Sequence, residues 1–313
     1  MIDAIWAART RLKGVTLRTP LIRLQGPAVG EGIWIKLENL QPGGSYKIRG
    51  LYNRIALVKD EVKARGAKTV SAGNTAIACA IACRELGASL EVLMADIASP
   101  MKVEAVQALG GTVVRCPHEH IFEYIEKELW REETRFFVHP FGHPDVWAGH
   151  GTCALEILED LPDVRVILVP IGGGGLITGV GAAVKALAPH VRVIGVQAAA
   201  IAPWPEAIRR RQPCSVPMTQ PTIADGIEVP AVYPVVWDVA KDLIDGCLTV
   251  SEAEIKQAMR LLAVHNRVVA EGAGAVTTAA ALKLHVSEGP VAAIITGGNV
   301  APSLLAGVLA GDS

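Results

Sequence analysis

The stretch Leu40-Gln41-Pro42-Gly43-Gly44-Ser45-Tyr46-Lys47-Ile48-Arg49-Gly50 decides how the chain is organised. Pro-Gly-Gly is a turn signal, and Ser45 has the type and position of a helix N-cap, which places Lys47 in the first helical turn. The start of a helix disfavours a cation, and partial burial would add to that effect. A neutral amine attacks carbonyl groups. Lys47 is therefore a candidate nucleophile, although a lone lysine on such a turn also fits an ordinary solvated side chain.

The composition indicates a globular protein with a large core. The chain has 313 residues, of which 50% are hydrophobic, and this length predicts one large or two modest domains. Its 30 basic and 31 acidic residues nearly cancel, which argues against nucleic acid or a membrane as partner. The sequence shows no signal peptide and no membrane-spanning apolar run. We expect a cytoplasmic protein.

Short apolar stretches alternate with helical patterns along most of the chain. This alternation predicts βαβ units, parallel sheets and an α/β fold. The segment 139–151 is rich in Gly, Pro and His and is the expected crossing between two lobes. The segment 198–235 holds seven prolines and is expected to be irregular. Strands are expected at 33–37, 68–71, 90–94, 112–115, 136–139, 164–171, 191–196 and 291–295, and helices at 51–65, 75–86, 100–109, 118–133, 176–187 and after Ser251.

Three polar or Gly-rich loops follow predicted strands, and helical segments come after them. These loops are residues 71–75, 172–175 and 296–299. Ligands of open parallel sheets bind at the carboxyl ends of the strands, so these loops are candidate site loops. Ordinary helix capping also fits the first loop, and a threonine bonded to its own backbone also fits Thr296.

The loop Gly172-Gly173-Gly174-Gly175 predicts a phosphate site, because backbone N–H groups converge there at the start of a helix. A dinucleotide fingerprint fails, since Ile177 or Thr178 stands at the place of its third glycine. A P-loop fails because Val180 stands where lysine is required. A single phosphate monoester remains, beside the alternative of a merely flexible glycine turn.

Four motifs follow one another in a specific order: Lys47 with its turn, Ser71-Ala72-Gly73-Asn74, the tetraglycine loop, and Thr296-Gly297-Gly298-Asn299. Because these motifs occur in this order, the chain resembles the fold-type II pyridoxal-phosphate enzymes. More narrowly, it resembles the serine/threonine dehydratase and serine racemase family. The resemblance implies a two-lobed α/β fold like that of tryptophan synthase β, with parallel twisted sheets flanked by helices and the cofactor in the inter-lobe cleft. It implies a large PLP-binding domain of residues 1–50 plus 143–313, a small domain of residues 51–142, and a homodimer. Further matches to this branch are Leu37-Glu38-Asn39-Leu40-Gln41-Pro42, His139-Pro140-Phe141, Thr222-Ile223-Ala224-Asp225-Gly226 and Glu271-Gly272-Ala273-Gly274-Ala275.

The resemblance also implies site roles. Lys47 is linked covalently to pyridoxal 5′-phosphate and is the catalytic residue, and Tyr46 packs near the cofactor ring. Asn74 hydrogen-bonds the pyridoxal 3-oxygen, and Thr296 faces the pyridine nitrogen. The phosphate is bound by Gly172, Gly173, Gly174 and Gly175, and the substrate carboxylate by the loop Ser71, Ala72, Gly73, Asn74 and Thr75.

The chain departs from the family pattern at several of these places. Thr75 replaces a usual histidine and Tyr46 a usual phenylalanine, which leaves substrate choice open. Gln197 and Pro203 stand where racemase-type members place acidic metal ligands. Neither is a carboxylate ligand for a hard cation, so no metal is expected.

The expected activity is β-elimination from a small β-hydroxy amino acid such as L-threonine or L-serine, giving a 2-keto acid and ammonia. A hydroxyl opposite the pyridine nitrogen makes the cofactor a weaker electron sink, which suits rapid loss of a β-substituent. Racemisation needs a second acid on the other face of Cα. Racemase-type relatives place a serine there, and this chain has Ala72. The alternatives are a serine or amino-acid racemase, a dehydratase of a bulkier or acidic 3-hydroxy amino acid, and a non-catalytic phosphate-ligand sensor.

Overall fold

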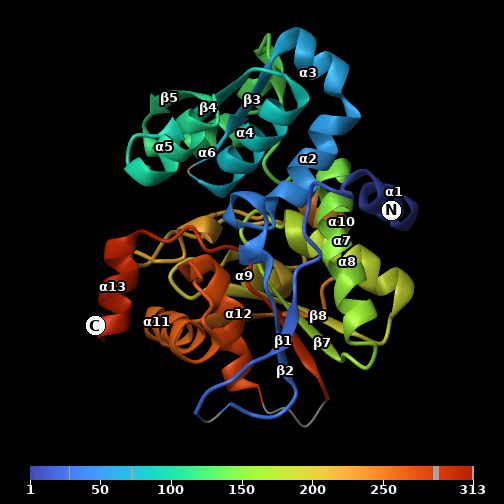
Figure 1. Cartoon of the computed structure of the whole chain (residues 1–313), viewed down its shortest axis with the longest axis vertical. Coiled ribbons are helices and arrows are strands. Elements are labelled where there is room, and N and C mark those ends of the chain that lie inside the picture. The colour runs from blue at the N-terminus through green and yellow to red at the C-terminus, as the bar shows by residue number, and fades with distance from the viewer. Residues whose placement is uncertain (28, 72, 285–288, 312–313) are drawn as a thin grey trace.

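The computed structural model describes residues 1–27, 29–71, 73–284 and 289–311. Within these residues the chain forms two β-sheets, one above the other in the view of Figure 1. The larger sheet has the strand order β1-β2-β10-β7-β8-β9, in which β1 runs antiparallel to β2 and the other pairings are parallel. Its strands are β1 (Leu21–Arg23), β2 (Ile33–Lys36), β7 (Val166–Pro170), β8 (Arg192–Ala198), β9 (Gly246–Val250) and β10 (Val291–Ile294).

The smaller sheet has the order β5-β4-β3-β6, and all of its pairings are parallel. Its strands and the helices around them come from one continuous part of the chain, which occupies the upper part of Figure 1. The predicted α/β class with parallel sheets flanked by helices is therefore confirmed. These elements are α3 (Lys59–Arg65), β3 (Ala67–Val70), α4 (Asn74–Leu86), β4 (Leu90–Ala95), α5 (Pro100–Ala108), β5 (Thr112–Cys116), α6 (His118–Glu126) and β6 (Phe136–Phe137).

Helices cover both faces of the larger sheet, because its central strands are apolar on both sides. On β7, Ile167 and Val169 belong to one buried cluster, while Val166 and Leu168 belong to another. This is the alternation of side chains expected along a strand. The first cluster includes α1 (Ile2–Arg11), α7 (Pro144–Asp160), α8 (Gly175–Leu187), α9 (Pro203–Arg210) and α10 (Pro234–Ala240); the second includes α11 (Glu252–Leu261), α12 (Gly272–Lys283) and α13 (Pro302–Ala310). Within the described residues, no helix is both long and apolar enough to cross a bilayer.

Helix α7 packs against α2 (Lys47–Leu57) and α8 at backbone distance. A Cβ on Gly149 would lie 2.2 Å from the Arg49 carbonyl oxygen, and one on Gly179 would lie 2.2 Å from that of Trp147. Real Cβ atoms do not approach that closely, so only glycine permits these contacts. The two helices that begin at the predicted nucleophile and at the glycine loop are thereby joined through α7.

Three predicted boundaries were wrong near the turn of Lys47 and in the small sheet. Helix α2 begins at Lys47 with Tyr46 as its N-cap, not Ser45, because Ser45 is extended and forms a bridge with Gly297. The expected helix 51–65 is two helices, interrupted at Val58. The expected helix 118–133 stops at Glu126, since Glu128 adopts a left-handed conformation.

Two segments for which no helix was predicted contain helices. Most of 139–151, the expected crossing between two lobes, belongs to α7, which begins at Pro144, a residue preorganised for the first helical position. The glycines of this segment serve helix packing. The proline-rich segment 198–235 contains α9, which likewise begins with a proline, Pro203.

Candidate active site

A cavity of about 350 Å³ lies between the two sheets and gathers the predicted site residues. Its lining includes residues from both sheets and from all three predicted loops. Ala72 lies outside the described residues. The predicted residues that line the cavity are Tyr46, Lys47, Ser71, Gly73, Asn74, Thr75, Gly172, Gly173, Gly174, Gly175 and Thr296.

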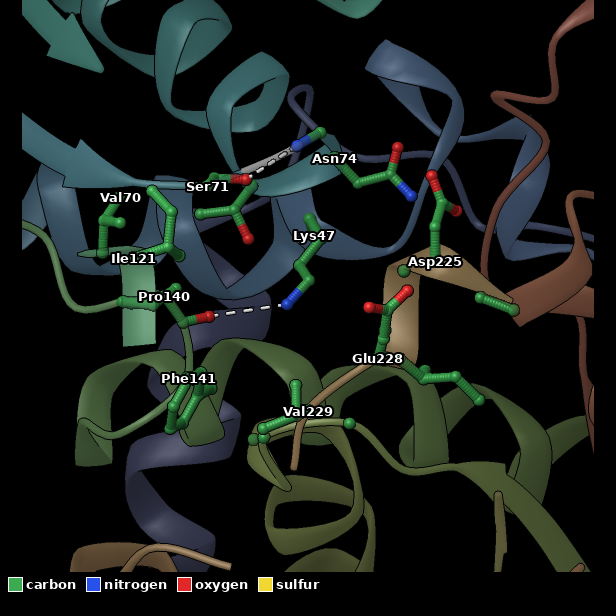
Figure 2. Close-up of a pocket in the computed structure, with 18 of the residues that line it drawn as sticks. Lys47, Val70, Ser71, Asn74, Ile121, Pro140, Phe141, Asp225, Glu228 and Val229 are labelled. Carbon is green, nitrogen blue, oxygen red and sulfur yellow. Dashed lines mark hydrogen bonds between the residues drawn. The ribbon is translucent and has the colours of Figure 1, made fainter. Parts of the chain in front are cut away.

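Lys47 is the first residue of α2, and its side chain projects into the cavity (Figure 2). Its Nζ lies 3.5 Å from the carbonyl oxygen of Pro140 and 5.3 Å from the centre of the Tyr46 ring. The Tyr46 ring in turn packs on the buried imidazole of His150, with the ring centres 4.7 Å apart. Among the described residues, the Pro140 carbonyl is the one hydrogen-bond partner of the amine, which is therefore placed at the cavity where a nucleophile could meet a carbonyl group.

The turn that carries the Pro140 carbonyl is built on His139. Its Nδ1 accepts hydrogen bonds from the backbone N–H groups of Gly142, at 2.8 Å, and Phe141, at 3.3 Å. Burial lowers the pKa of His139 to about 4, and the nearby charges of His143 and Lys47 act in the same direction. The imidazole is therefore neutral at physiological pH and can accept both bonds.

The Lys47 turn is tied to the Thr296 loop, although the two are far apart in sequence. The backbone N–H of Tyr46 donates to the Thr296 carbonyl at 3.0 Å, and that of Gly298 donates to the Gly44 carbonyl at 3.0 Å. The Thr296 hydroxyl is 3.4 Å from the carbonyl oxygen of Ala273. Thr296 lines the cavity while remaining only 4% exposed, so its hydroxyl can meet a ligand in a site sheltered from bulk water.

The tetraglycine loop connects β7 to the start of α8. Gly174 has φ of +87°, a conformation that favours glycine, and a Cβ on Gly173 would lie 2.4 Å from the Phe141 ring. Among the described residues, no hydrogen-bond acceptor is paired with the backbone N–H groups of Gly172 to Leu176. Free donors at a helix start, beside the Lys47 amine, fit a phosphate-bearing aldehyde such as pyridoxal 5′-phosphate.

The loop 71–75 leads into α4, which begins at Asn74. The Ser71 hydroxyl oxygen accepts hydrogen bonds from the backbone N–H groups of Gly73, at 3.0 Å, and Ala76, at 3.3 Å, so Ser71 stabilises the loop itself. The start of α4 and Thr75 line the cavity. The positive end of the helix favours an anion there.

Charged residues that the sequence interpretation did not assign also line the cavity. Lys102 on α5 is only 6% exposed and forms an ion pair of 2.5 Å with Asp225, which lies in the 3-10 turn Asp225–Ile227 between α9 and α10. Glu228 is turned into the cavity (Figure 2), and burial raises its pKa. Glu271 lies beside Asn74. The motifs quoted above contain Asp225 and Glu271, but nothing local to Lys102 distinguishes it from a surface lysine.

Gln197 is used inside the protein. Its Nε2 donates to the Ile171 carbonyl at 3.1 Å, and its Oε1 accepts from the Trp204 backbone N–H at 2.9 Å. Over the part of the chain that the structure describes, no group of three or more His, Cys, Asp or Glu side chains is arranged to hold a metal ion.

Comparisons with known proteins agree with this site. A family model described as pyridoxal-phosphate dependent enzyme matches residues 12–297. The chain is 41% identical over 305 residues to the L-threonine ammonia-lyase of Thermotoga maritima, covering 96% of this chain and 75% of that protein. It is 37% identical over 308 residues to the catabolic L-threonine dehydratase TdcB of Escherichia coli K12, covering 96% and 93%. The structure of maize serine racemase superposes with a TM-score of 0.89 at 31% identity, covering 99% and 97%. The chain therefore belongs to the pyridoxal-phosphate-dependent enzymes, in the family of serine/threonine dehydratases and serine racemases.

Proposed function

We propose that this chain is a PLP-dependent ammonia-lyase that deaminates L-threonine or L-serine to a 2-keto acid and ammonia. The observation that carries the proposal is one cavity in which the Lys47 amine, the free N–H groups of the tetraglycine loop and the start of α4 meet. The named activities of the Thermotoga and Escherichia relatives give the substrate class.

The residues that line the cavity support the following proposed roles. Lys47 would hold the cofactor, and its Nζ would accept the substrate Cα proton. Gly172 to Gly175 would bind the phosphate, Thr296 would face the ring nitrogen, and Asn74 would bind the 3-oxygen. When bound, the cofactor supplies the electron sink that makes the Cα proton acidic.

The substrate carboxylate is proposed to bind at the loop of residues 71–75. The start of α4 supplies backbone N–H groups. The Lys102 amine adds a positive charge close to Gly73, because a Cβ built on that glycine would lie only 3.2 Å from Nζ. Loss of the Cα proton and the Cβ hydroxyl releases water, and hydrolysis of the resulting enamine gives the keto acid and ammonia.

A panel of 3-hydroxy amino acids, assayed for keto-acid release, tests this proposal. L-threonine and L-serine should be turned over, and Lys47→Ala should abolish turnover while the protein remains folded. Keto-acid release confined to bulky or acidic substrates would overturn the substrate assignment. Absence of turnover with every substrate, despite PLP binding, would favour a non-catalytic sensor.

Racemisation is the second candidate, favoured by the similarity to maize serine racemase. The sequence argues against it as the main activity, because Ala72 has no proton to return to the second face of Cα. We also propose a cytoplasmic homodimer and a division into residues 1–50 plus 143–313 and residues 51–142. The strands of the small sheet, all between residues 67 and 137, support that division.

A further inference from the structure

Glu271 connects the two sheets at the edge of the cavity. It is the N-cap residue of α12, but its carboxylate forms no capping hydrogen bond with that helix, and the residue is only 3% exposed. Its Oε1 instead accepts a hydrogen bond of 2.6 Å from Nδ2 of Asn74, which comes from the small-sheet side. The partner of this buried side chain is 197 positions away in the sequence, so Glu271 stabilises the arrangement of the site and not its own helix.

The second oxygen of this carboxyl group is the unusual feature. Oε2 of Glu271 is buried and has no hydrogen-bond partner among the described residues. An ionised carboxylate with one oxygen unbonded away from water is costly. Burial accordingly raises the pKa of Glu271 to about 7, and the charge of Asp225 adds to this, while Lys102, the Asn74 hydrogen bond and Lys47 oppose it.

The amide of Asn74 is fixed from both ends. Its Oδ1 accepts from Nδ2 of Asn299 at 2.8 Å, and the same Asn299 nitrogen donates to the Gly43 carbonyl at 2.8 Å. Asn74 Nδ2 carries two hydrogens. Glu271 takes one of them, and the other remains for a ligand in the cavity.

The backbone at Gly297 leaves room for this contact. A Cβ there would lie 2.3 Å from Oε1 of Glu271 and 3.1 Å from Nδ2 of Asn74. A larger residue would separate the pair. The second residue of the Thr-Gly-Gly-Asn motif is therefore glycine because of the Glu271–Asn74 contact.

We propose that Glu271 is a positioning residue that acts through Asn74 on the bound cofactor, and that it does so as a neutral carboxylic acid. The inference rests on the proposed role of Asn74 and not on the identity of the substrate. PLP carries an anionic phosphate and a 3-oxygen, so ionisation of Glu271 would repel it in a sheltered cavity. Cofactor binding and protonation of Glu271 are then linked.

The test is the dissociation constant of PLP, measured by fluorescence titration of the apoprotein from pH 6 to pH 9. Glu271→Gln is neutral at every pH and keeps an oxygen to accept from Asn74. Subtracting its profile from that of the wild type removes the titrations of PLP and Lys47. The wild type should lose affinity relative to Glu271→Gln above about pH 7, by up to about tenfold per pH unit for one proton. Superimposable pH profiles for the two proteins would overturn the neutral-acid assignment.

A second comparison tests whether Glu271 acts through Asn74. Glu271→Ala should weaken PLP binding about tenfold at pH 6.5 in the wild-type background. The same change in an Asn74→Ala background should have little further effect. Equal losses in both backgrounds would overturn the positioning role. The control is Glu252→Gln, which should match the wild type. Glu252 also has a buried oxygen without a hydrogen-bond partner among the residues that the structure describes, but it lies outside the cavity lining. Binding of PLP is measured without substrate, so these results stand even if deamination is disproved.

Discussion

Replacing Arg49 by methionine should destabilise the fold, because it removes one cation from a buried network of ion pairs. Arg49 stands two residues after Lys47. Arg49 is 1% exposed and Glu38 is 0% exposed, and bonds of 2.7 and 2.8 Å join the guanidinium to the two carboxylate oxygens. The guanidinium also donates to both oxygens of Glu156, at 2.8 and 2.9 Å. Lys36 lies 2.7 Å from Glu156. The two cations and two anions balance one another.

The size of the effect follows from what Arg49→Met leaves behind. Glu156 keeps Lys36 as its ion-pair partner, whereas Glu38 retains neutral hydrogen-bond donors such as the Thr19 hydroxyl. A buried charge that has lost its partner costs about 3–5 kcal/mol. At roughly 2 °C per kcal/mol for a chain of this size, the melting temperature should fall by roughly 6–10 °C.

A double variant and the pH dependence separate this mechanism from general damage. Burial raises the pKa of Glu38, but the charge and hydrogen bonds of Arg49 outweigh burial and hold that pKa below its usual range. The pair therefore stabilises the wild type above the usual carboxyl pKa, and its contribution is lost as the pH falls through the lowered value. Without Arg49, burial dominates, so the deficit of the variant should shrink as the pH is lowered from 7 towards 5. Adding Glu38→Gln removes the unpaired charge and should restore part of the stability at pH 7.

The assay is thermal unfolding by circular dichroism, with the same saturating PLP concentration for every variant. Arg54→Met is the matched control, because the Arg54–Asp145 pair is more exposed and should contribute about 1 kcal/mol or less. The reasoning fails if the melting temperature of Arg49→Met lies within about 2 °C of that of the wild type, because this corresponds to only about 1 kcal/mol. It also fails if the double variant loses the sum of the two single losses.

Four further outcomes are expected. Borohydride reduction with PLP and peptide mapping should label Lys47, and a label on another lysine would contradict its assignment. Lys102→Met should raise KM about tenfold with little change in kcat; an unchanged KM in steady-state kinetics would remove Lys102 from the carboxylate site. Burial lowers the pKa of His139 to about 4 and that of His150 well below its usual value, so both neutral rings stabilise the fold above about pH 6.5 and that contribution is lost as the pH falls. Coincident urea midpoints at pH 7.5 and pH 5.5 would contradict this. Ala72→Ser should raise racemisation relative to keto-acid formation, measured by chiral chromatography beside a keto-acid assay, and wild-type racemisation as fast as keto-acid release would disprove the argument.

The parts of the fold that could be predicted from sequence are those with local causes. The apolar run that becomes β7 and the capping box at Ser251, whose hydroxyl accepts from the Glu254 backbone N–H, depend on neighbouring residues alone. The site loops were also predictable, because they follow strands. In contrast, α7 was not predicted, because Gly149 disfavours a helix locally and its benefit comes from a contact with α2.

The candidate site shows the same division. Lys47 and the tetraglycine loop carry distinctive patterns of their own, and the structure places them in one cavity. Lys102 and Glu271 matter through partners 123 and 197 positions away, Asp225 and Asn74. No periodicity or spacing along the chain reports such pairings, so their place in the site needed the tertiary structure.

The glycine contacts of α7 have a mechanical consequence. Lys47 and Gly175 each begin a helix that touches α7 backbone to backbone, so changes of side-chain rotamer cannot alter the spacing between the Lys47 backbone and the tetraglycine loop. Asn74 reaches the same cavity from α4, which packs on α2 through apolar side chains of one buried cluster. Its amide is tied to the other sheet by hydrogen bonds to Glu271 and Asn299. The Asn74 wall of the cavity can therefore adjust by repacking of side chains, whereas the wall formed by the Lys47 turn and the tetraglycine loop can adjust only if the backbone moves.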